Sequence, residues 1–192
     1  MHFTLADLIT DIAQNAAEAG SSLVELEITE TDKGAGGRPE FRFVVKDNGR
    51  GMSEEELAHA TDPFVTDRVK HPGRKIGLGI PFLIHTAGQS GGGWDLKSEN
   101  KGELHGTTVT AWFDLNNVDT PPVGDLSGMF RTIFLFEGPG DVRIRRSLIK
   151  ENRAGREYEV RKSDLAKTLG ELEDAQSLIL LDQYLRSLEE GD

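Results

Sequence analysis

The sequence lacks features that define several common functional classes. Its 192 residues include no cysteine, and aromatic residues make up only 7% of the chain. Without cysteine there are no disulfides, no thiolate nucleophile, no iron–sulfur ligands and no usual structural zinc site. No apolar run approaches the roughly 20 residues that a membrane-spanning helix needs, and the acidic N-terminal segment does not resemble a secretory signal. We therefore expect a cytoplasmic protein that does not associate with membranes.

Basic residues are scarce relative to acidic ones. The chain has 22 lysine and arginine residues against 33 aspartate and glutamate residues, which gives a net charge of -11 at pH 7. Because nucleic-acid phosphates require a basic face, this balance opposes non-specific binding to DNA. With 36% hydrophobic and 29% charged residues, the composition is that of a globular protein with one core. We expect the partner to be a small anion held locally or another protein, and not a nucleic acid.

The periodicity of apolar residues predicts an α+β fold. Apolar positions at helical spacing and capping signatures predict helices, and alternating apolar positions predict strands. The predicted helices cover residues 5–19, 53–60 and 77–88, the last one entered through a loop, and the predicted strands cover residues 23–30, 41–47, 94–98 and 107–115. Since helices alternate with antiparallel strands, we expect a two-layer α/β sandwich, with a mixed, mostly antiparallel sheet and helices on one face.

A change of composition divides the chain near residue 116. The segment NNVDTPPVGD contains the consecutive prolines Pro121 and Pro122, which favour a boundary. We predict a first domain over residues 1–116 and a C-terminal extension over residues 117–192.

The extension is predicted to contain a β-hairpin and a leucine-rich helix. Two strand-like runs, Phe130–Phe136 and Val142–Leu148, are joined by the turn sequence EGPGD. Leucines at helical spacing predict a helical tail from Ser163 to Glu189, whose apolar face shifts near Gly170. This leucine stripe predicts packing on the protein's own body or on a partner, which includes a homodimer through the C-terminal helix.

Polar residues in two places are candidates for chemistry. On the first predicted helix, Asp11, Asn15 and Glu18 share one stripe beside the apolar face, although a solvated helix flank would look the same. Asp47 has the strand parity of Phe43 and the other apolar residues of its strand, so its carboxylate should point toward the helices. An unpaired charge is costly there, so Asp47 needs a hydrogen-bond donor. The alternative is an ordinary Asp-Asn-Gly turn.

Glycines follow these polar residues at the ends of predicted elements. Gly49 and Gly51 would let the backbone pass close to a flat ligand. The segment KIGLGI, with Gly77 and Gly79, leads into a helix N-terminus, where free amides and the helix dipole attract phosphate. The sequence HGTT, which contains Thr107, opens the last predicted strand of the first domain.

In this order, the segments resemble the sequence boxes of the histidine kinase-like ATPase superfamily, which includes DNA gyrase, MutL proteins, the heat-shock ATPase chaperone and sensor histidine kinases. DIAQNAAEAG is similar to the asparagine box, DNGRGM to the first glycine box, DPFVTDRVKHPGRKIGLGI to the phenylalanine box, lid and second glycine box, and HGTTVTAWF to the final strand. The resemblance covers residues 1 to about 116. It implies a stand-alone bacterial member with the Bergerat-type ATP-binding fold, which takes ATP or ADP with Mg²⁺.

The resemblance also implies roles for residues that would surround the base. Asp47 matches the carboxylate that accepts a hydrogen bond from the adenine amino group. Gly49 and Gly51 would line the base, with Met52 beside them. Thr107 would join Asp47 in a water-bridged contact to the base.

Other matched residues would bind the phosphates and the metal. Asn15 matches the side chain that ligates magnesium, which prefers oxygen donors. Lys75, Gly77, Leu78 and Gly79 would hold the phosphates. The basic segment from residue 65 to residue 76 would form a lid that closes over the triphosphate.

Asp11 departs from the family pattern. ATP-hydrolysing branches and anti-sigma serine kinases usually carry a glutamate at this place as the general base, and aspartate is one methylene shorter. The resemblance therefore implies a slow Mg²⁺-dependent ATPase whose nucleotide state regulates an unidentified protein partner. A serine protein kinase of the anti-sigma type and a module that binds the nucleotide without turnover are the alternatives.

Overall fold

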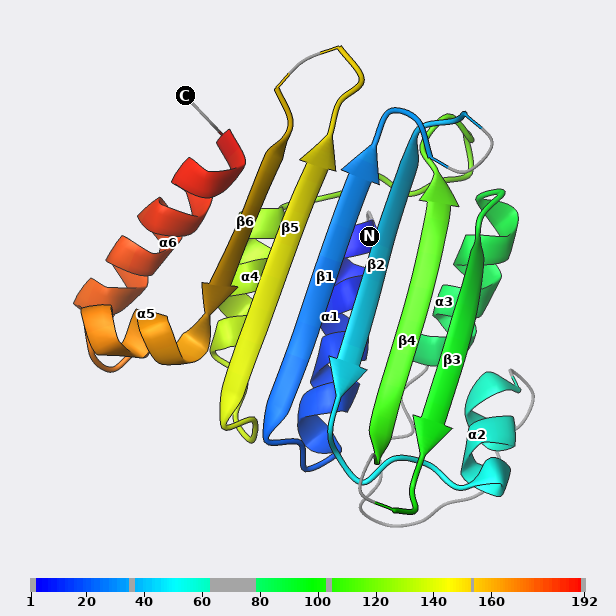
Figure 1. Ribbon diagram of the computed structural model, residues 1–192, viewed down its shortest axis with the longest axis horizontal. Helices are drawn as coiled ribbons and strands as arrows, with labels where there is room; N and C mark the ends of the chain where they lie inside the picture. Colours follow the sequence, from blue (N-terminus) through cyan, green and yellow to red (C-terminus); the bar gives the residue numbers. More distant parts are fainter. Residues whose placement is uncertain (1–2, 35–36, 63–78, 103–104, 153, 191–192) are drawn as a thin grey trace.

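The computed structural model describes residues 3–34, 37–62, 79–102, 105–152 and 154–190. Within these residues, six strands form one sheet in the order β3-β4-β2-β1-β5-β6 (Figure 1). Neighbouring strands are antiparallel except β1 and β5, which are parallel. The strands are β1 (Leu23–Thr31), β2 (Glu40–Asp47), β3 (Gly93–Glu99), β4 (Gly106–Asp114), β5 (Asp141–Ile149) and β6 (Arg156–Arg161). The mixed, mostly antiparallel sheet is the predicted one.

Helices cover one face of this sheet, as predicted. In Figure 1, α1, α3 and α4 lie behind the sheet, whereas α6 lies beside β6 at one edge. The helices are α1 (Leu5–Glu18), α2 (Glu54–Thr61), α3 (Gly79–Gln89), α4 (Leu126–Phe134), α5 (Lys162–Leu169) and α6 (Ala175–Glu190). No helix in the described part of the chain is long and apolar enough to cross a membrane.

The first helix begins where the sequence predicts. The hydroxyl of Thr4 accepts a hydrogen bond from the amide of Asp7 at 3.1 Å, and the Asp7 carboxylate accepts one from the Thr4 amide at 2.9 Å. These two bonds form a capping box and satisfy amides that the first helical turn leaves without partners. The next amides, of Leu5 and Ala6, donate to the carbonyls of Pro122 and Val123, each at 2.9 Å.

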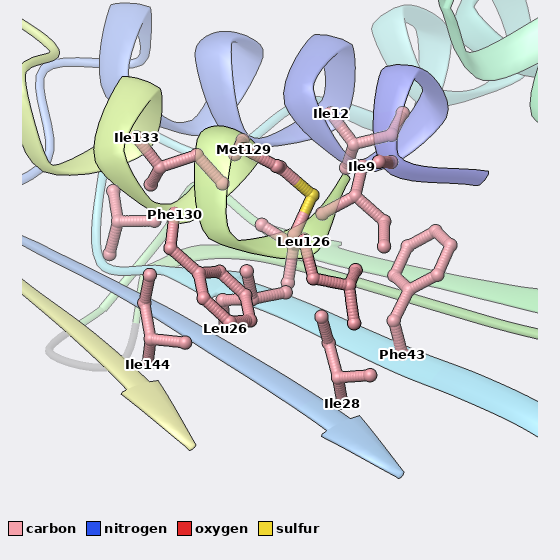
Figure 2. Close-up of a cluster of buried hydrophobic side chains, with 14 of the residues drawn as sticks. Ile9, Ile12, Leu26, Ile28, Phe43, Leu126, Met129, Phe130, Ile133 and Ile144 are labelled. Carbon is pink, nitrogen blue, oxygen red and sulfur yellow. The ribbon is translucent and has the colours of Figure 1, made fainter. Parts of the chain in front are cut away.

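Apolar side chains from both layers fill the space between α1, α4 and the sheet. Alternate residues of β1 and β2 point inward, and they meet helical residues spaced by three and four positions. Figure 2 shows this cluster, which includes Ile9, Ile12, Leu26, Ile28, Phe43, Leu126, Met129, Phe130, Ile133 and Ile144. All these side chains are buried, so the core joins residues from both sides of the predicted domain boundary.

The opposite face of the sheet carries charged side chains. The Glu25 carboxylate forms ion pairs with Lys46 on β2 and Arg143 on β5, and Arg145 bridges to Glu159 on β6 at 3.0 Å. The more exposed pair of Arg145 and Glu159 stabilises the fold by only about 1 kcal/mol or less. The presence of these ion pairs shows that this face is polar, which agrees with a two-layer fold.

The prediction of a strand over Phe130–Phe136 is wrong. Residues up to Phe134 belong to α4, whose N-cap Asp125 accepts a hydrogen bond from the Gly128 amide at 3.0 Å. The physical reason is the period of the apolar residues, which recur at helical spacing from Leu126 onward and all face the core. The hairpin of this region is formed by β5 with β6, and the sequence analysis did not predict β6.

The tail is helical, as predicted, with a break at Gly170, where φ is 79°. The leucine stripe packs on the protein's own body, since Leu181 and Leu185 are fully buried. Because β5 pairs with β1, the C-terminal extension contributes strands to the same sheet as the first predicted domain. The division at residue 116 stays a prediction.

Candidate functional site

Asp47 lies at the end of β2 with its side chain on the covered face. It alternates with Phe43 and Val45, and it is only 6% exposed. The parity prediction is therefore confirmed. Its Oδ1 accepts a hydrogen bond from the Gly49 amide at 2.8 Å, which supplies the donor that a buried carboxylate requires.

The electrostatic environment of Asp47 disfavours its charge. Burial raises the pKa of the Asp47 carboxyl above its ordinary value of 3.8, although hydrogen bonds from the Gly49 and Thr107 backbones and the nearby His105 oppose this shift. Burial removes water from the carboxylate and destabilises its ionised form, and carboxylates perturbed in this way are typical of functional sites. A ligand that donates a hydrogen bond to Asp47 would offset part of this destabilisation.

Gly49 packs directly on the end of α1. A Cβ atom at this position would lie 2.7 Å from both the Cβ and the carbonyl oxygen of Ala19, so no other residue fits without a shift. The Arg50 amide then donates to the same Ala19 carbonyl at 3.0 Å. Gly51 has a φ of +65°, a conformation that favours glycine. The turn after β2 is thereby fixed against α1, with Asp47 beside it.

The side chain of Asn48 is used within the fold. Its Oδ1 accepts hydrogen bonds from the amides of Ser22 and Leu23, each at 2.9 Å, and its Nδ2 donates to the Ser22 hydroxyl at 2.8 Å. Asn48 therefore ties the segment between α1 and β1 to the end of β2, next to Asp47.

Thr107 on β4 lies opposite Asp47 in the strand register. The hydroxyls of Thr107 and Ser98 are 2.9 Å apart, and the Ser98 hydroxyl accepts a hydrogen bond from the Met52 amide at 2.8 Å. The structure thus brings together the five residues that the sequence analysis placed around the base: Asp47, Gly49, Gly51, Met52 and Thr107.

The sequence analysis missed two residues of this group. Ser98 links Met52 to Thr107, and the Nδ1 of His105 lies 2.5 Å from the Gly49 carbonyl oxygen. Ser98 pairs with Thr107 across β3 and β4, so its strand parity was the available signal. His105 stands in the HGTT segment, where its position beside Gly106 was the signal.

A second part of the site lies where α3 begins against α1. A Cβ atom at Gly79, the first residue of α3, would lie 3.3 Å from the Asp11 Cβ and 3.7 Å from the Asn15 Nδ2. The N-terminus of a helix attracts anions through its free amides and its dipole. Glu18, the third residue of the predicted stripe, accepts a hydrogen bond from Gln14 at 2.8 Å.

The carboxyl group of Asp11 is also perturbed. Partial burial and the neighbouring Asp7 carboxylate raise the pKa of Asp11 above its ordinary value of 3.8. A carboxylate of raised pKa is a stronger proton acceptor than an ordinary one. Lys75, Gly77, Leu78 and the basic segment from residue 65 to residue 76 lie outside the described residues.

The two parts of the site are joined by one turn of α1. Asn15 lies near Gly79 and Ala19 contacts Gly49, and four helical residues span about 6 Å along the axis. One part offers a buried hydrogen-bond acceptor, and the other offers a helix N-terminus with the side-chain amide of Asn15 beside it. This arrangement suits a small ligand with hydrogen-bond donors at one end and negative charge at the other.

Comparisons with known proteins agree with this geometry. A family model described as histidine kinase-, DNA gyrase B-, and HSP90-like ATPase matches residues 3–117. The chain is 33% identical over 111 residues to the DNA mismatch repair protein MutL of Trichlorobacter lovleyi, which covers 55% of this chain and 17% of that protein. It is 29% identical over 108 residues to MutL of Thermus aquaticus, covering 56% of this chain and 19% of that protein. The chain thus spans less than a fifth of the length of these curated relatives.

A solved structure is also similar to this chain. It is the topoisomerase IV ATP-binding domain of Francisella tularensis in complex with a small-molecule inhibitor, with 17% identity and a TM-score of 0.36. The similarity covers 79% of this chain and 83% of that one.

Proposed function

Because the chain belongs to the histidine kinase-, DNA gyrase B-, and HSP90-like ATPase family, we propose that it binds ATP with Mg²⁺, hydrolyses it slowly and controls a protein partner through its nucleotide state. Membership of this family supports ATP binding. The observation that carries the proposal is the buried carboxylate of Asp47, one helical turn of α1 away from the N-terminus of α3.

The adenine would lie against Asp47. The exocyclic amino group of adenine is a hydrogen-bond donor, and the ionised carboxylate is an acceptor only. Thr107 lies opposite Asp47 in the register and offers a hydroxyl for a water-bridged contact. Gly49 and Gly51 allow the backbone to approach the plane of the base, and Met52 adds an apolar side chain next to them.

The phosphates would lie at the N-terminus of α3. Gly79 places this terminus beside Asn15 and Asp11, so an anion held there would meet both side chains. The side-chain oxygen of Asn15 is a hard donor that suits Mg²⁺, and phosphate oxygens would complete its coordination. Lys75, Gly77 and Leu78 are proposed as further phosphate contacts on the family resemblance alone.

Asp11 is the proposed general base, which would accept a proton from the attacking water. Its raised pKa favours proton acceptance, but its side chain is one methylene shorter than that of glutamate. A misplacement of about 1 Å can lower a rate by roughly a hundredfold, so hydrolysis is expected to be slow.

A radiolabel assay distinguishes the possible outcomes of ATP binding. The purified protein is incubated with magnesium and [γ-³²P]ATP, alone and with proteins encoded by neighbouring genes, and free phosphate and labelled protein are followed. Release of free phosphate alone supports the ATPase. Label on a partner protein supports a serine kinase, and binding with neither product supports a module that holds the nucleotide without turnover.

Variants of the α1 stripe test the assigned roles. Asp11→Asn should abolish turnover and retain ATP affinity, whereas Asp11→Glu should raise the rate because it restores the longer side chain. Asn15→Ala should lose magnesium-dependent binding as well. Glu18→Gln, a matched change on the same stripe, should leave the rate of phosphate release unchanged. If Asp11→Asn hydrolyses ATP as fast as the parent, Asp11 is not the base and the binding module becomes the better proposal.

A further inference from the structure

His105 contacts the turn that follows β2 through one defined ring nitrogen. Its Nδ1 lies 2.5 Å from the carbonyl oxygen of Gly49. A carbonyl oxygen can only accept a hydrogen bond, so Nδ1 must carry the proton and donate it. The His105 side chain is exposed, so this contact is not explained by packing in the core. It joins the segment before β4 to the turn after β2.

The close packing of Gly106 brings His105 against this turn. A Cβ atom at Gly106 would lie 2.1 Å from the carbonyl oxygen of Asp47 and 3.0 Å from the Cα of Asn48, so no larger residue fits there without a shift. The chain at the start of β4 is therefore in direct contact with the backbone of Asp47. This contact holds His105, the residue before Gly106, beside the turn that carries Asp47 and Gly49.

Gly49 is the residue that the His105 contact restrains. Glycine has more backbone freedom than any other residue and loses the most when it is ordered. The Gly49 amide donates to the Asp47 Oδ1 at 2.8 Å, and the Gly49 carbonyl accepts from His105. Because the amide belongs to the peptide before Gly49 and the carbonyl to the peptide after it, the two bonds together restrain both of its backbone torsion angles. His105 thereby helps to fix the amide that orients the Asp47 carboxylate.

We propose that His105 is a positioning residue for the nucleotide, a role that rests on the proposed contact of adenine with Asp47. It acts through Gly49 and Asp47, and it orders the turn before the ligand arrives. Binding to an ordered site is tighter, because the ligand does not have to supply the free energy of ordering. Loss of the restraint on one backbone residue should weaken ADP binding by about tenfold.

Three variants test whether a donor at the position of Nδ1 is what matters. His105→Asn keeps an N–H donor near that position, His105→Gln moves the donor outward to about the position of Nε2, and His105→Leu removes it. In calorimetric titration, His105→Leu and His105→Gln should bind ADP about tenfold more weakly than the parent, and His105→Asn should bind it like the parent. All three should melt near the parent's temperature, because the side chain is exposed. His85→Leu, a matched change at an exposed histidine of α3, should leave ADP affinity unchanged.

A measurement without nucleotide separates this role from the proposed function. Amide hydrogen exchange in residues 48–51, followed by NMR, should be faster in His105→Leu than in the parent and should return to the parent's rate in His105→Asn. Equal exchange in His105→Leu and the parent, or equal affinity of the two for ADP, would overturn the role of His105 and leave the proposed function standing. A parent that does not bind ADP would overturn both, whatever the exchange rates.

Discussion

Substitution of Asp47 by asparagine should change nucleotide binding and folding in opposite directions. Asparagine keeps an oxygen that can accept the hydrogen bond from the Gly49 amide, now 2.8 Å long, but it loses the charge. The lost charge-assisted bond to the adenine amino group is worth about 1.5–3 kcal/mol. This corresponds to roughly a ten- to hundredfold weaker affinity for ADP, measured by calorimetric titration.

The same change should not lower the stability of the protein without ligand. Burial raises the pKa of the Asp47 carboxyl, so its contribution to folding is favourable below the ordinary value of 3.8 and is lost as the pH rises through the raised value. Asp47→Asn removes this pH-dependent loss, and its melting temperature at neutral pH should equal or exceed that of the parent. The difference should shrink as the pH falls toward 3.8. The affinity of the parent for ADP should fall in the same direction, because the protonated carboxyl no longer accepts with both oxygens.

Asp95→Asn is the matched control. Asp95 lies on β3, its side chain is 48% exposed, and it pairs with Lys97 on the polar face of the sheet. This variant should bind ADP like the parent. Unchanged ADP affinity in Asp47→Asn would refute the adenine assignment, and a lower melting temperature at neutral pH would refute the argument from burial.

Two further pairs of variants test the packing around the site and the C-terminal helix by urea unfolding. Gly49→Ala should lower the free energy of unfolding by about 1–3 kcal/mol because its Cβ meets Ala19, whereas Gly88→Ala, with no atom within 4 Å, should raise it by about 0.5–1 kcal/mol. A neutral Gly49→Ala would contradict the close approach. Arg146→Ala should cost about 3–5 kcal/mol because Arg146 is 3% exposed and its loss removes the buried ion pairs to Glu30 and Glu189, whereas Arg145→Ala on the polar face should cost about 1 kcal/mol or less. Equal losses in these two arginine variants would show that the buried cluster does not fix α6.

Local signals in the sequence predicted most of the helices and strands before residue 116, and they predicted that the Asp47 side chain points inward. Period-two alternation in β2 determines which side chains face the core, and the one charged residue on that parity is Asp47. Capping boxes at Thr4 and Ser53 place the starts of α1 and α2 correctly. These features depend on residues a few positions apart, so a single sequence contains them.

The strand predicted over Phe130–Phe136 is wrong because this segment contains only the second half of α4, which begins at Leu126. Between Phe130 and Phe136 all residues except Arg131 are apolar, aromatic or β-branched, which is typical of a strand. The helical spacing becomes visible only when Leu126 and Met129 are included, and Asp125 before them supplies the N-cap.

Long-range pairings were not predictable from local patterns. The parallel pairing of β5 with β1 joins segments more than 100 residues apart, and nothing in either segment specifies the other. The contact of Ser98 with Met52 and Thr107 likewise depends on how β3, β4 and the turn after β2 meet. The resemblance to the family's sequence boxes assigned these residues to one site. The hydrogen bonds between them could be identified only from the three-dimensional structure.

A crystal structure of the protein with bound ADP tests the central claim most directly, because the claim concerns where the nucleotide lies. The account predicts the adenine amino group within about 3.2 Å of the Asp47 carboxylate and the phosphates at the N-terminus of α3, beside Asn15. A nucleotide bound elsewhere on the protein, or an adenine whose amino group has no contact with Asp47, would contradict it.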